Sequence, residues 1–200
     1  MAIDVKGLLA DALLALCEKK PLSKITVTDL RQATGVSRQT FYNHFKDKQH
    51  LIEYVYESRT IAKWKYPSVL NTDFCDALIS CLECDVRYHS FIKQALLINE
   101  QNCLQDFMYE HSKKFNRAWH QAYYGKEPLP DFLCFASDYH SAAQMHMRIE
   151  WILNNMPVPV KELAENIIRM RVVGLNELLF EDNIENSPYT TALERISEIK

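Results

Sequence analysis

Hydrophobic residues recur at intervals of three and four along most of the chain, and this spacing predicts amphipathic helices. The first helix is expected from about Val5 to Cys17, where a Lys-Lys-Pro run ends the pattern. Three further helices follow before residue 66, the last from about Lys48 to Lys65. The first third of the chain is therefore predicted to be a small helical domain.

Polar residues stand where these short helices should begin and end. Thr26 can cap a helix whose third residue, Asp29, completes a capping box. Gly35 can adopt the positive φ of a helix C-terminus, and Ser37 can cap the next helix two residues later. Asp47 is a plausible cap for the fourth helix. Two short helices joined by a tight glycine turn predict a helix-turn-helix motif over about residues 26–45.

The helix from Arg38 to Phe45 divides into a buried and an outward face. Phe41 and Phe45, four residues apart, are expected to face the core, which leaves a polar set to point outward. Guanidinium and amide groups can pair with base edges, whereas hydroxyl, imidazole and ammonium groups can reach phosphates. The alternative is that this surface is only the solvated face of a helical bundle. The outward set comprises Arg38, Gln39, Thr40, Tyr42 and His44.

Residues 25–51, ITVTDLRQATGVSRQTFYNHFKDKQHL, resemble the DNA-binding signature of the TetR family of bacterial transcriptional regulators. The resemblance lies mainly in T-G-V-S-x-x-T-F-Y-x-H-F-K-x-K and extends from about residue 4 to residue 65. It implies that Thr28 lies near the DNA backbone and that Arg38, Gln39 and Thr40 face the major groove.

The same resemblance implies phosphate contacts for Tyr42, His44 and Lys48. Asn43 departs from the family pattern, because many relatives carry a basic or aromatic residue there. The partner implied is a double-stranded, palindromic DNA operator.

The distribution of charge agrees with a nucleic-acid-binding N-terminal domain. The whole chain has a formal net charge of −3, but residues 1–66 carry 11 Lys and Arg against 7 Asp and Glu. Residues 67–200 carry 12 against 19. A small basic module joined to an acidic domain is typical of DNA-binding regulators.

Beyond Pro67 the pattern predicts longer helices, the first capped by Asn71 or Thr72. The fold class expected is all-α, with an N-terminal helix-turn-helix domain over 1–66 followed by a helical-bundle domain for ligand binding and dimerisation over 67–181. The polar tail over 182–200 is either a short docked helix or a frayed end. The helices expected in the second domain span about 74–84, 89–97, 104–123, 131–155 and 160–180, with Asp131 as the cap of the fourth.

The last two long helices, over about 131–155 and 160–180, have more apolar surface than one monomer needs to bury. A homodimer through these helices would also supply the paired recognition helices that operator binding requires; the alternative is that both are internal helices. The W-I-x-x-x-M run from Trp151 to Met156 resembles a TetR subgroup related to regulators of dihydroxyacetone kinase operons. That resemblance implies the same interface.

TetR regulators generally hold a small-molecule effector in the second domain, so an effector of unknown identity is expected here. Aromatic residues with one polar tip suit ligands of mixed polarity, although aromatics at helical spacing are more often simply core. The candidate ligand-binding residues are Tyr88, Phe91, Trp119, Tyr123 and Tyr139.

Cys81 and Cys84 form a C-x-x-C motif, which raises the alternatives of a metal site and a redox sensor. Structural zinc needs four ligands, and no second C-x-x-C or H-x-x-x-H is present, so we expect buried thiols and no bound metal. His140 and His146 raise a copper site in the same way, but six-residue spacing does not place them on one helix face.

Four dispersed glycines exclude the usual nucleotide loops and nucleophile elbows, so neither an enzyme nor a cofactor is expected. No export signal and no stretch of 18 apolar residues is visible, which predicts a cytoplasmic protein with no membrane partner. The function predicted is a DNA-binding repressor controlled by a small molecule. The alternative is an activator or adaptor controlled by a protein partner through the second domain.

Overall fold

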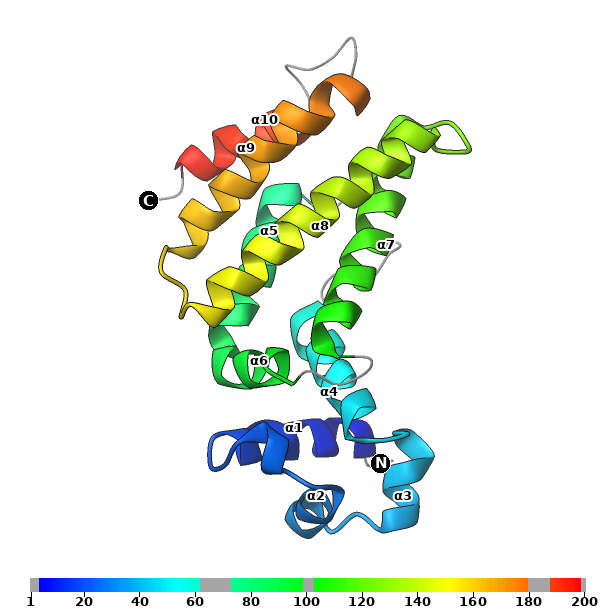
Figure 1. The fold of residues 1–200 in the computed structure, drawn as a ribbon, viewed down its shortest axis with the longest axis vertical. Coiled ribbons are helices and arrows are strands. Elements are labelled where there is room, and N and C mark those ends of the chain that lie inside the picture. The colour runs from blue at the N-terminus through cyan, green and yellow to red at the C-terminus, as the bar shows by residue number, and fades with distance from the viewer. Residues whose placement is uncertain (1–3, 62–72, 99–102, 180–187, 199–200) are drawn as a thin grey trace. The chain divides into compact units, whose positions relative to one another are not determined.

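The computed structural model describes residues 4–61, 73–98, 103–179 and 188–198, and every regular element within them is helical (Figure 1). The chain forms two compact units. The first comprises residues 1–62 and 87–107, and the second comprises residues 63–86 and 108–200.

The first unit contains the short helices expected from the sequence. They are α1 (Val5–Cys17), the 3-10 turn η1 (Leu22–Lys24), α2 (Val27–Thr34), α3 (Arg38–His44) and α4 (Lys48–Tyr56), which continues as a π-helical turn over Glu57–Ile61. The fourth helix was expected to reach Lys65, but residues 62–72 lie outside the described residues.

The predicted caps in the first unit are confirmed. Asp29 N–H donates to Thr26 Oγ1 over 3.2 Å, and the Asp29 carboxylate accepts the Thr26 N–H over 2.7 Å, completing the capping box. Gly35 ends α2 with φ of 73°. Ser37 Oγ accepts the Thr40 N–H over 3.0 Å, and Asp47 Oδ1 accepts the His50 N–H over 2.8 Å. Each helix boundary is thus fixed by a contact within a few residues.

Helix α6 (His89–Leu96) also belongs to the first unit, although the sequence prediction assigned it to the C-terminal domain. It packs against α1 and η1 (Figure 1). The packing buries the apolar side of α6, including Phe91 and Ile92. The two domains predicted as continuous segments therefore interleave along the chain.

The second unit contains α5 (Phe74–Arg87), most of α7 (Leu104–Tyr124), α8 (Asp131–Leu153), α9 (Val160–Leu179) and α10 (Pro188–Glu198). The expected caps Asn71 and Thr72 lie outside the described residues, and Asp73 Oδ1 accepts the Asp76 N–H at the start of α5. Asp131 is the first residue of α8 rather than its cap, because Pro130 occupies the cap position.

The tail predicted as polar contains the helix α10, which packs against α9. Ala192 and Ile196 are fully buried on α10, and Arg195 pairs with Asp73 over 2.6 Å and Asp76 over 3.0 Å. Of the two alternatives for this segment, the structure shows a docked helix.

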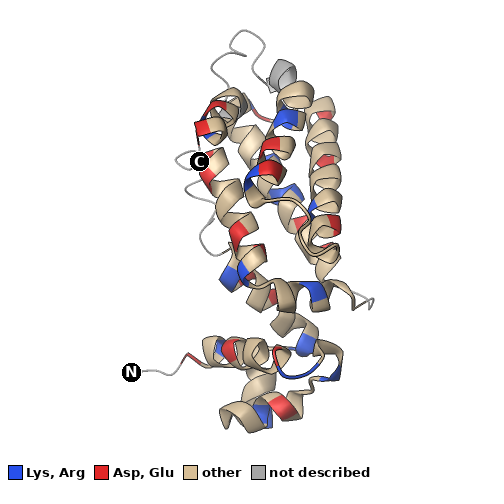
Figure 2. Cartoon of the chain, turned by 90° about the vertical axis from the view of Figure 1, so that its left-hand side faces the viewer, with Lys and Arg blue, Asp and Glu red and all other residues tan. Residues whose placement is uncertain are grey.

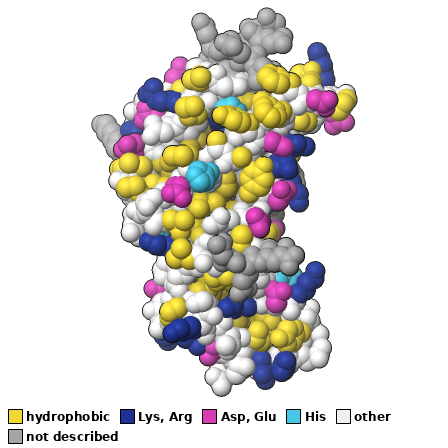
Figure 3. Space-filling view, viewed as in Figure 1, with side chains coloured by type: hydrophobic (Ala, Val, Ile, Leu, Met, Phe, Trp, Pro, Cys, Tyr) yellow, Lys and Arg dark blue, Asp and Glu magenta, His cyan; other side chains and the backbone are white. Residues whose placement is uncertain are grey.

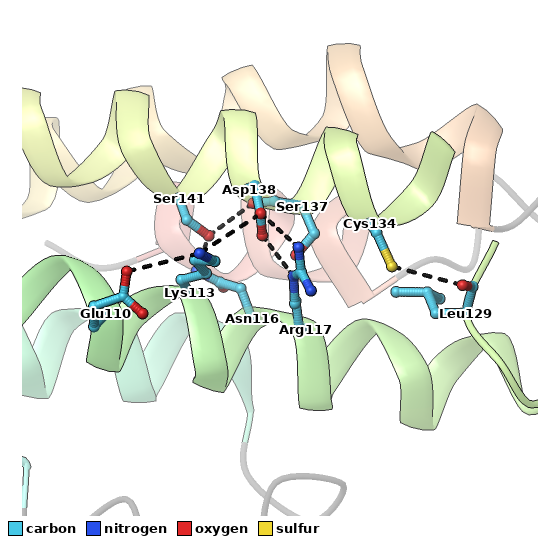
Figure 4. Close-up of polar contacts among 9 residues, drawn as sticks. All are labelled: Glu110, Lys113, Asn116, Arg117, Leu129, Cys134, Ser137, Asp138 and Ser141. Atoms are coloured by element: carbon cyan, nitrogen blue, oxygen red, sulfur yellow. Dashed lines mark hydrogen bonds and ion pairs between the residues drawn. The ribbon is translucent and has the colours of Figure 1, made fainter. Parts of the chain in front are cut away.

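Helices α7, α8 and α9 share a buried polar network, whose members on α7 and α8 are drawn in Figure 4. Asn116 Nδ2 donates to Ser141 Oγ over 2.9 Å, and Ser141 Oγ donates to the Ser137 carbonyl over 2.7 Å. Buried Arg171 donates to Asn116 Oδ1 over 2.8 Å. Nearer the surface, Arg117 makes two hydrogen bonds of 2.6 Å to Asp138. Because buried polar groups are costly unless satisfied, this network fixes how the three helices pack.

Candidate nucleic-acid interface

The apolar side of α3 anchors the helix in the first unit. Phe41 is fully buried and Phe45 is 1% exposed, and their rings lie 5.9 Å apart. Phe45 also contacts Tyr54 of α4, with ring centroids 5.4 Å apart. This packing sets which side chains of α3 remain available to a partner.

The residues predicted to read bases are at the surface of the first unit. Arg38 and Gln39 are exposed, and Thr40 is half-buried with its hydroxyl 2.8 Å from Ser37 Oγ. The Arg38 guanidinium lies over the Tyr42 ring, 5.7 Å from its centroid. An exposed guanidinium beside an exposed amide can form the bidentate pairs by which proteins recognise guanine and adenine.

Asn43, which departs from the family pattern, contacts a predicted reading residue. Its Oδ1 accepts a hydrogen bond from Gln39 Nε2 over 3.0 Å. The two residues are four apart on α3, so they share one face of the helix. Asn43 thus orients the Gln39 amide, a role that its spacing from Gln39 could have suggested.

The residues predicted to contact phosphates lie on several elements of the first unit. Thr28 is exposed in the first turn of α2, Tyr42 is 44% exposed, and His44 is half-buried at the end of α3. Lys48 is half-buried at the start of α4, where its ammonium donates to the Leu22 carbonyl over 3.1 Å. Figure 2 shows the Lys and Arg residues of this unit on its ribbon.

Two lysines close to α3 were missed by the sequence reasoning. Lys6 lies over the rings of Phe45 and Tyr54, 5.8 and 5.4 Å from their centroids, so its charge is held beside the end of α3. Lys46 is exposed immediately after α3. Lys46 could have been found from its place between the recognition helix and Lys48, whereas the contacts of Lys6 required the structure.

One salt bridge stabilises the start of α2. Lys20 Nζ lies 2.7 Å from Asp29 Oδ2, and this contact together with the Thr26 hydrogen bonds lowers the pKa of Asp29 to about 2. Asp29 is therefore ionised at neutral pH and is committed to the helix cap.

Comparison with known proteins agrees with this geometry. Residues 9–55 match the family model described as bacterial regulatory proteins, tetR family. Residues 73–171 match the TetR model described as transcriptional regulator C-terminal region. The chain belongs to the TetR family.

Solved structures share the fold of this TetR-family regulator. The dihydroxyacetone kinase operon activator DhaS is 19% identical with a TM-score of 0.63, covering 86% of this chain and 96% of that one. TylP, a TetR regulator from Streptomyces fradiae, is 14% identical with a TM-score of 0.54, covering 98% and 100%. No curated protein matches the chain in sequence. The family consists of DNA-binding transcription factors rather than enzymes.

The aromatic residues predicted to bind an effector are spread over both units of the regulator. Tyr88 and Phe91 lie in the first unit, where Phe91 is buried within the α6 contact. In the second unit, Trp119 and Tyr123 are in contact with ring centroids 4.2 Å apart, and Tyr139 is 63% exposed on α8. The structure thus brings together only Trp119 and Tyr123 of this set.

A groove of about 380 Å³ lies between α8 and α9 in the second unit. Among the predicted aromatics, Tyr139 lines it, together with apolar residues such as Met147 and Ile167. Its polar lining comes from His140, Gln144, Asn166 and Arg171. The groove opens in a face where exposed hydrophobic side chains gather over α8 and α9 (Figure 3). These exposed residues are Phe132, Phe135, Tyr139, Met147, Met170 and Val173.

The six cysteines are free thiols. Burial raises the pKa of Cys81 to about 11 and that of Cys17 to about 12, so both remain protonated at neutral pH. Reactive and metal-binding cysteines act as thiolates. Within the described parts of the chain, no group of three or more His, Cys, Asp and Glu could hold a metal ion. No helix among the described residues is long and apolar enough to cross a membrane.

Two histidines in the second unit are expected to make its stability dependent on pH. Burial, followed by the charge of Arg171, lowers the pKa of His120 well below its usual value and also lowers that of His140. In the unfolded chain a histidine titrates near about 6.5. The unfolded state therefore binds protons that the folded state excludes, and the unfolding free energy is expected to fall as pH drops below that value. Each histidine contributes at most about 1.4 kcal/mol per pH unit.

Urea denaturation at several pH values between about 7.5 and 5.5 checks this expectation. A His120→Gln variant removes one titrating group, so its stability should decline less steeply over the same range than that of the wild type. Equal slopes for the two proteins would contradict the assignment of this pH dependence to His120.

Proposed function

We propose that this TetR-family regulator is a cytoplasmic homodimeric repressor that binds a palindromic operator and releases it when a small-molecule effector binds. The observation that carries the DNA-binding part is α3 itself. Both of its boundaries are fixed, Phe41 and Phe45 anchor its inner side, and Arg38 and Gln39 are exposed on its outer side. Thr40 completes the proposed base-reading set, with Thr28, Tyr42, His44 and Lys48 on the phosphates.

The homodimer is proposed through the exposed apolar face of α8 and α9. Large contiguous apolar surfaces on a folded domain mark sites of association. The groove between these helices belongs to the same face, and in a two-fold dimer the partner copy would cover it. Two copies bound to one operator would place two recognition helices in successive major grooves.

An activator or adaptor role is the second candidate. It is supported by the similarity in fold to DhaS, the dihydroxyacetone kinase operon activator. Transcription in vitro separates the two roles, with a template that carries the operator identified by the library selection described below. Repression would lower transcript yield when the protein is added, whereas activation would raise it.

The experiment that tests the proposed function is selection of bound sequences from a random duplex library, followed by titration of the enriched duplex at several salt concentrations. A two-fold symmetric consensus and a steep loss of affinity with salt are expected. The matched control is the Tyr42→Ala/Lys48→Ala double variant, which should bind the same duplex more weakly. If the wild-type protein enriched no sequence, the proposal that the purified protein binds an operator without a partner would be overturned.

Replacing Arg38 by alanine is expected to change base preference as well as affinity. A bidentate pair with guanine contributes about 1–3 kcal/mol of discrimination, and alanine cannot form it. Repeating the library selection with Arg38→Ala measures the change. Lys48→Met is the control, because losing a phosphate contact should weaken binding to all sequences without changing the consensus. An unchanged consensus for Arg38→Ala would contradict its role in base reading.

A further inference from the structure

One side chain of α6 bridges two elements of the helix-turn-helix domain. Gln94 Oε1 accepts the N–H of Leu22 over 2.7 Å, and Gln94 Nε2 donates to the carbonyl of Cys17 over 3.3 Å. Cys17 ends α1, and Leu22 begins η1. A single amide thus satisfies a backbone acceptor at one helix end and a backbone donor at the start of the next element.

The residue held by Gln94 also contacts Lys48. The Leu22 carbonyl accepts a hydrogen bond from Lys48 Nζ over 3.1 Å, and the Ser23 carbonyl lies 3.5 Å from the same nitrogen. Leu22 is 1% exposed; its N–H is paired with Gln94, and its carbonyl accepts the Ile25 N–H over 3.1 Å as well as the Lys48 ammonium. The N–H of Leu22 is therefore tied to α6, and its carbonyl is tied to the first residue of α4.

This arrangement restricts the flexible Lys48 side chain at the carbonyls of η1. A lysine ammonium has three donors, and two backbone carbonyls engage two of them, which leaves one for a further acceptor. Lys48 is the first residue of α4, four residues after the end of α3, and its ammonium is held at the carbonyls of η1. A cation held in one position before binding loses less conformational freedom when it meets a phosphate.

We propose that Gln94 is a positioning residue for DNA binding. It holds the Leu22 peptide, and the Leu22 carbonyl in turn orients the Lys48 ammonium for a DNA phosphate. This inference rests on the proposed function, in which Lys48 contacts the operator backbone. It also gives α6 a defined role. In chain order α6 lies between α5 and α7, most of whose residues belong to the second unit, while α6 itself belongs to the first unit with the helix-turn-helix.

The test is a double-mutant cycle in the full-length chain, measured on the duplex enriched by the wild-type protein. Gln94→Leu removes both hydrogen bonds at similar volume, and Lys48→Met removes the ammonium. Each single variant is expected to weaken binding about tenfold, as for loss of one charge-assisted hydrogen bond. Gln94→Leu should also lower the slope of log affinity against log salt by about one, because the phosphate contact of Lys48 is lost.

In the Lys48→Met background, Gln94→Leu should cause little further loss, since the group that it positions is already absent. Ser90→Ala is the matched control on α6. Its hydroxyl is exposed and is 3.4 Å from Gln94 Nε2, and its loss should leave both affinity and salt slope unchanged.

Thermal unfolding of each variant shows whether it is folded before binding is compared. Additive losses in the cycle, or an unchanged salt slope for Gln94→Leu in a folded variant, would overturn the positioning role while leaving the proposed function intact. Failure of the wild-type protein to bind any duplex would overturn the proposed function and this inference with it.

Discussion

Replacing Asp85 by asparagine is expected to lower the unfolding free energy by about 3–5 kcal/mol. Asp85 of α5 is fully buried, and its carboxylate accepts two hydrogen bonds from Arg148 of α8, of 2.5 and 2.7 Å. Only 6% of the Arg148 side chain is exposed. Asparagine has nearly the same shape but no charge, so the variant would leave the guanidinium buried without its counter-ion. Urea denaturation of the wild type and the variant measures the loss.

Two comparisons separate the charge from other effects of the Asp85 substitution. Asp76→Asn makes the same chemical change on α5, but Asp76 is an exposed partner of Arg195, so only a small change in stability is expected. An Asp85→Leu/Arg148→Met variant removes both charges and should recover most of the stability lost in Asp85→Asn. A loss no larger for Asp85→Asn than for Asp76→Asn would show that the buried pair does not control stability.

The sequence predicted the DNA-binding helices well because their boundaries depend on local contacts. Thr26 and Asp29 are three residues apart, and so are Ser37 and Thr40, so spacing alone reveals the caps that the structure shows. Gly35 marks the turn for an equally local reason, because its positive φ of 73° is a conformation that favours glycine. The outward face of α3 follows once Phe41 and Phe45 are recognised as buried.

Contacts between distant segments could not be predicted in this way. Gln94 and Leu22 are separated by 72 positions, and Asp85 and Arg148 by 63. In the sequence, nothing in the local spacing of Gln94, Asp85 or Arg148 identifies these distant partners. The membership of α6 in the first unit therefore became visible only in three dimensions.

Periodicity also failed to distinguish the environments of the aromatic residues in the second unit. Trp119 and Tyr139 both occupy regular helical positions, yet Trp119 is 2% exposed and Tyr139 is 63% exposed. A hydrophobic pattern identifies the side of a helix that avoids water. It does not state whether that side meets its own core, a ligand or a second copy of the chain.

Disrupting the proposed dimer is expected to cause a large loss of both self-association and operator affinity. A Phe135→Glu/Val173→Glu variant places two charges on the exposed face of α8 and α9, where the wild-type side chains are 65% and 77% exposed. Because both sites face solvent in the monomer, the substitutions should leave the fold of each copy intact. In a dimer they would bury unpaired charges, which is far more costly than leaving the same charges in water. The variant is therefore expected to sediment as a monomer in analytical ultracentrifugation.

Loss of the dimer should lower affinity for a two-fold symmetric operator by about 100-fold or more, because the second half-site no longer benefits from a tethered recognition helix. Val86→Glu is the matched control, since Val86 is 48% exposed but belongs to α5 rather than to α8 or α9. That variant should remain a dimer with unchanged affinity. If the Phe135→Glu/Val173→Glu protein stayed dimeric, the two copies would have to associate through another surface. The apolar face and its groove would then be available to a different partner, as the adaptor alternative requires.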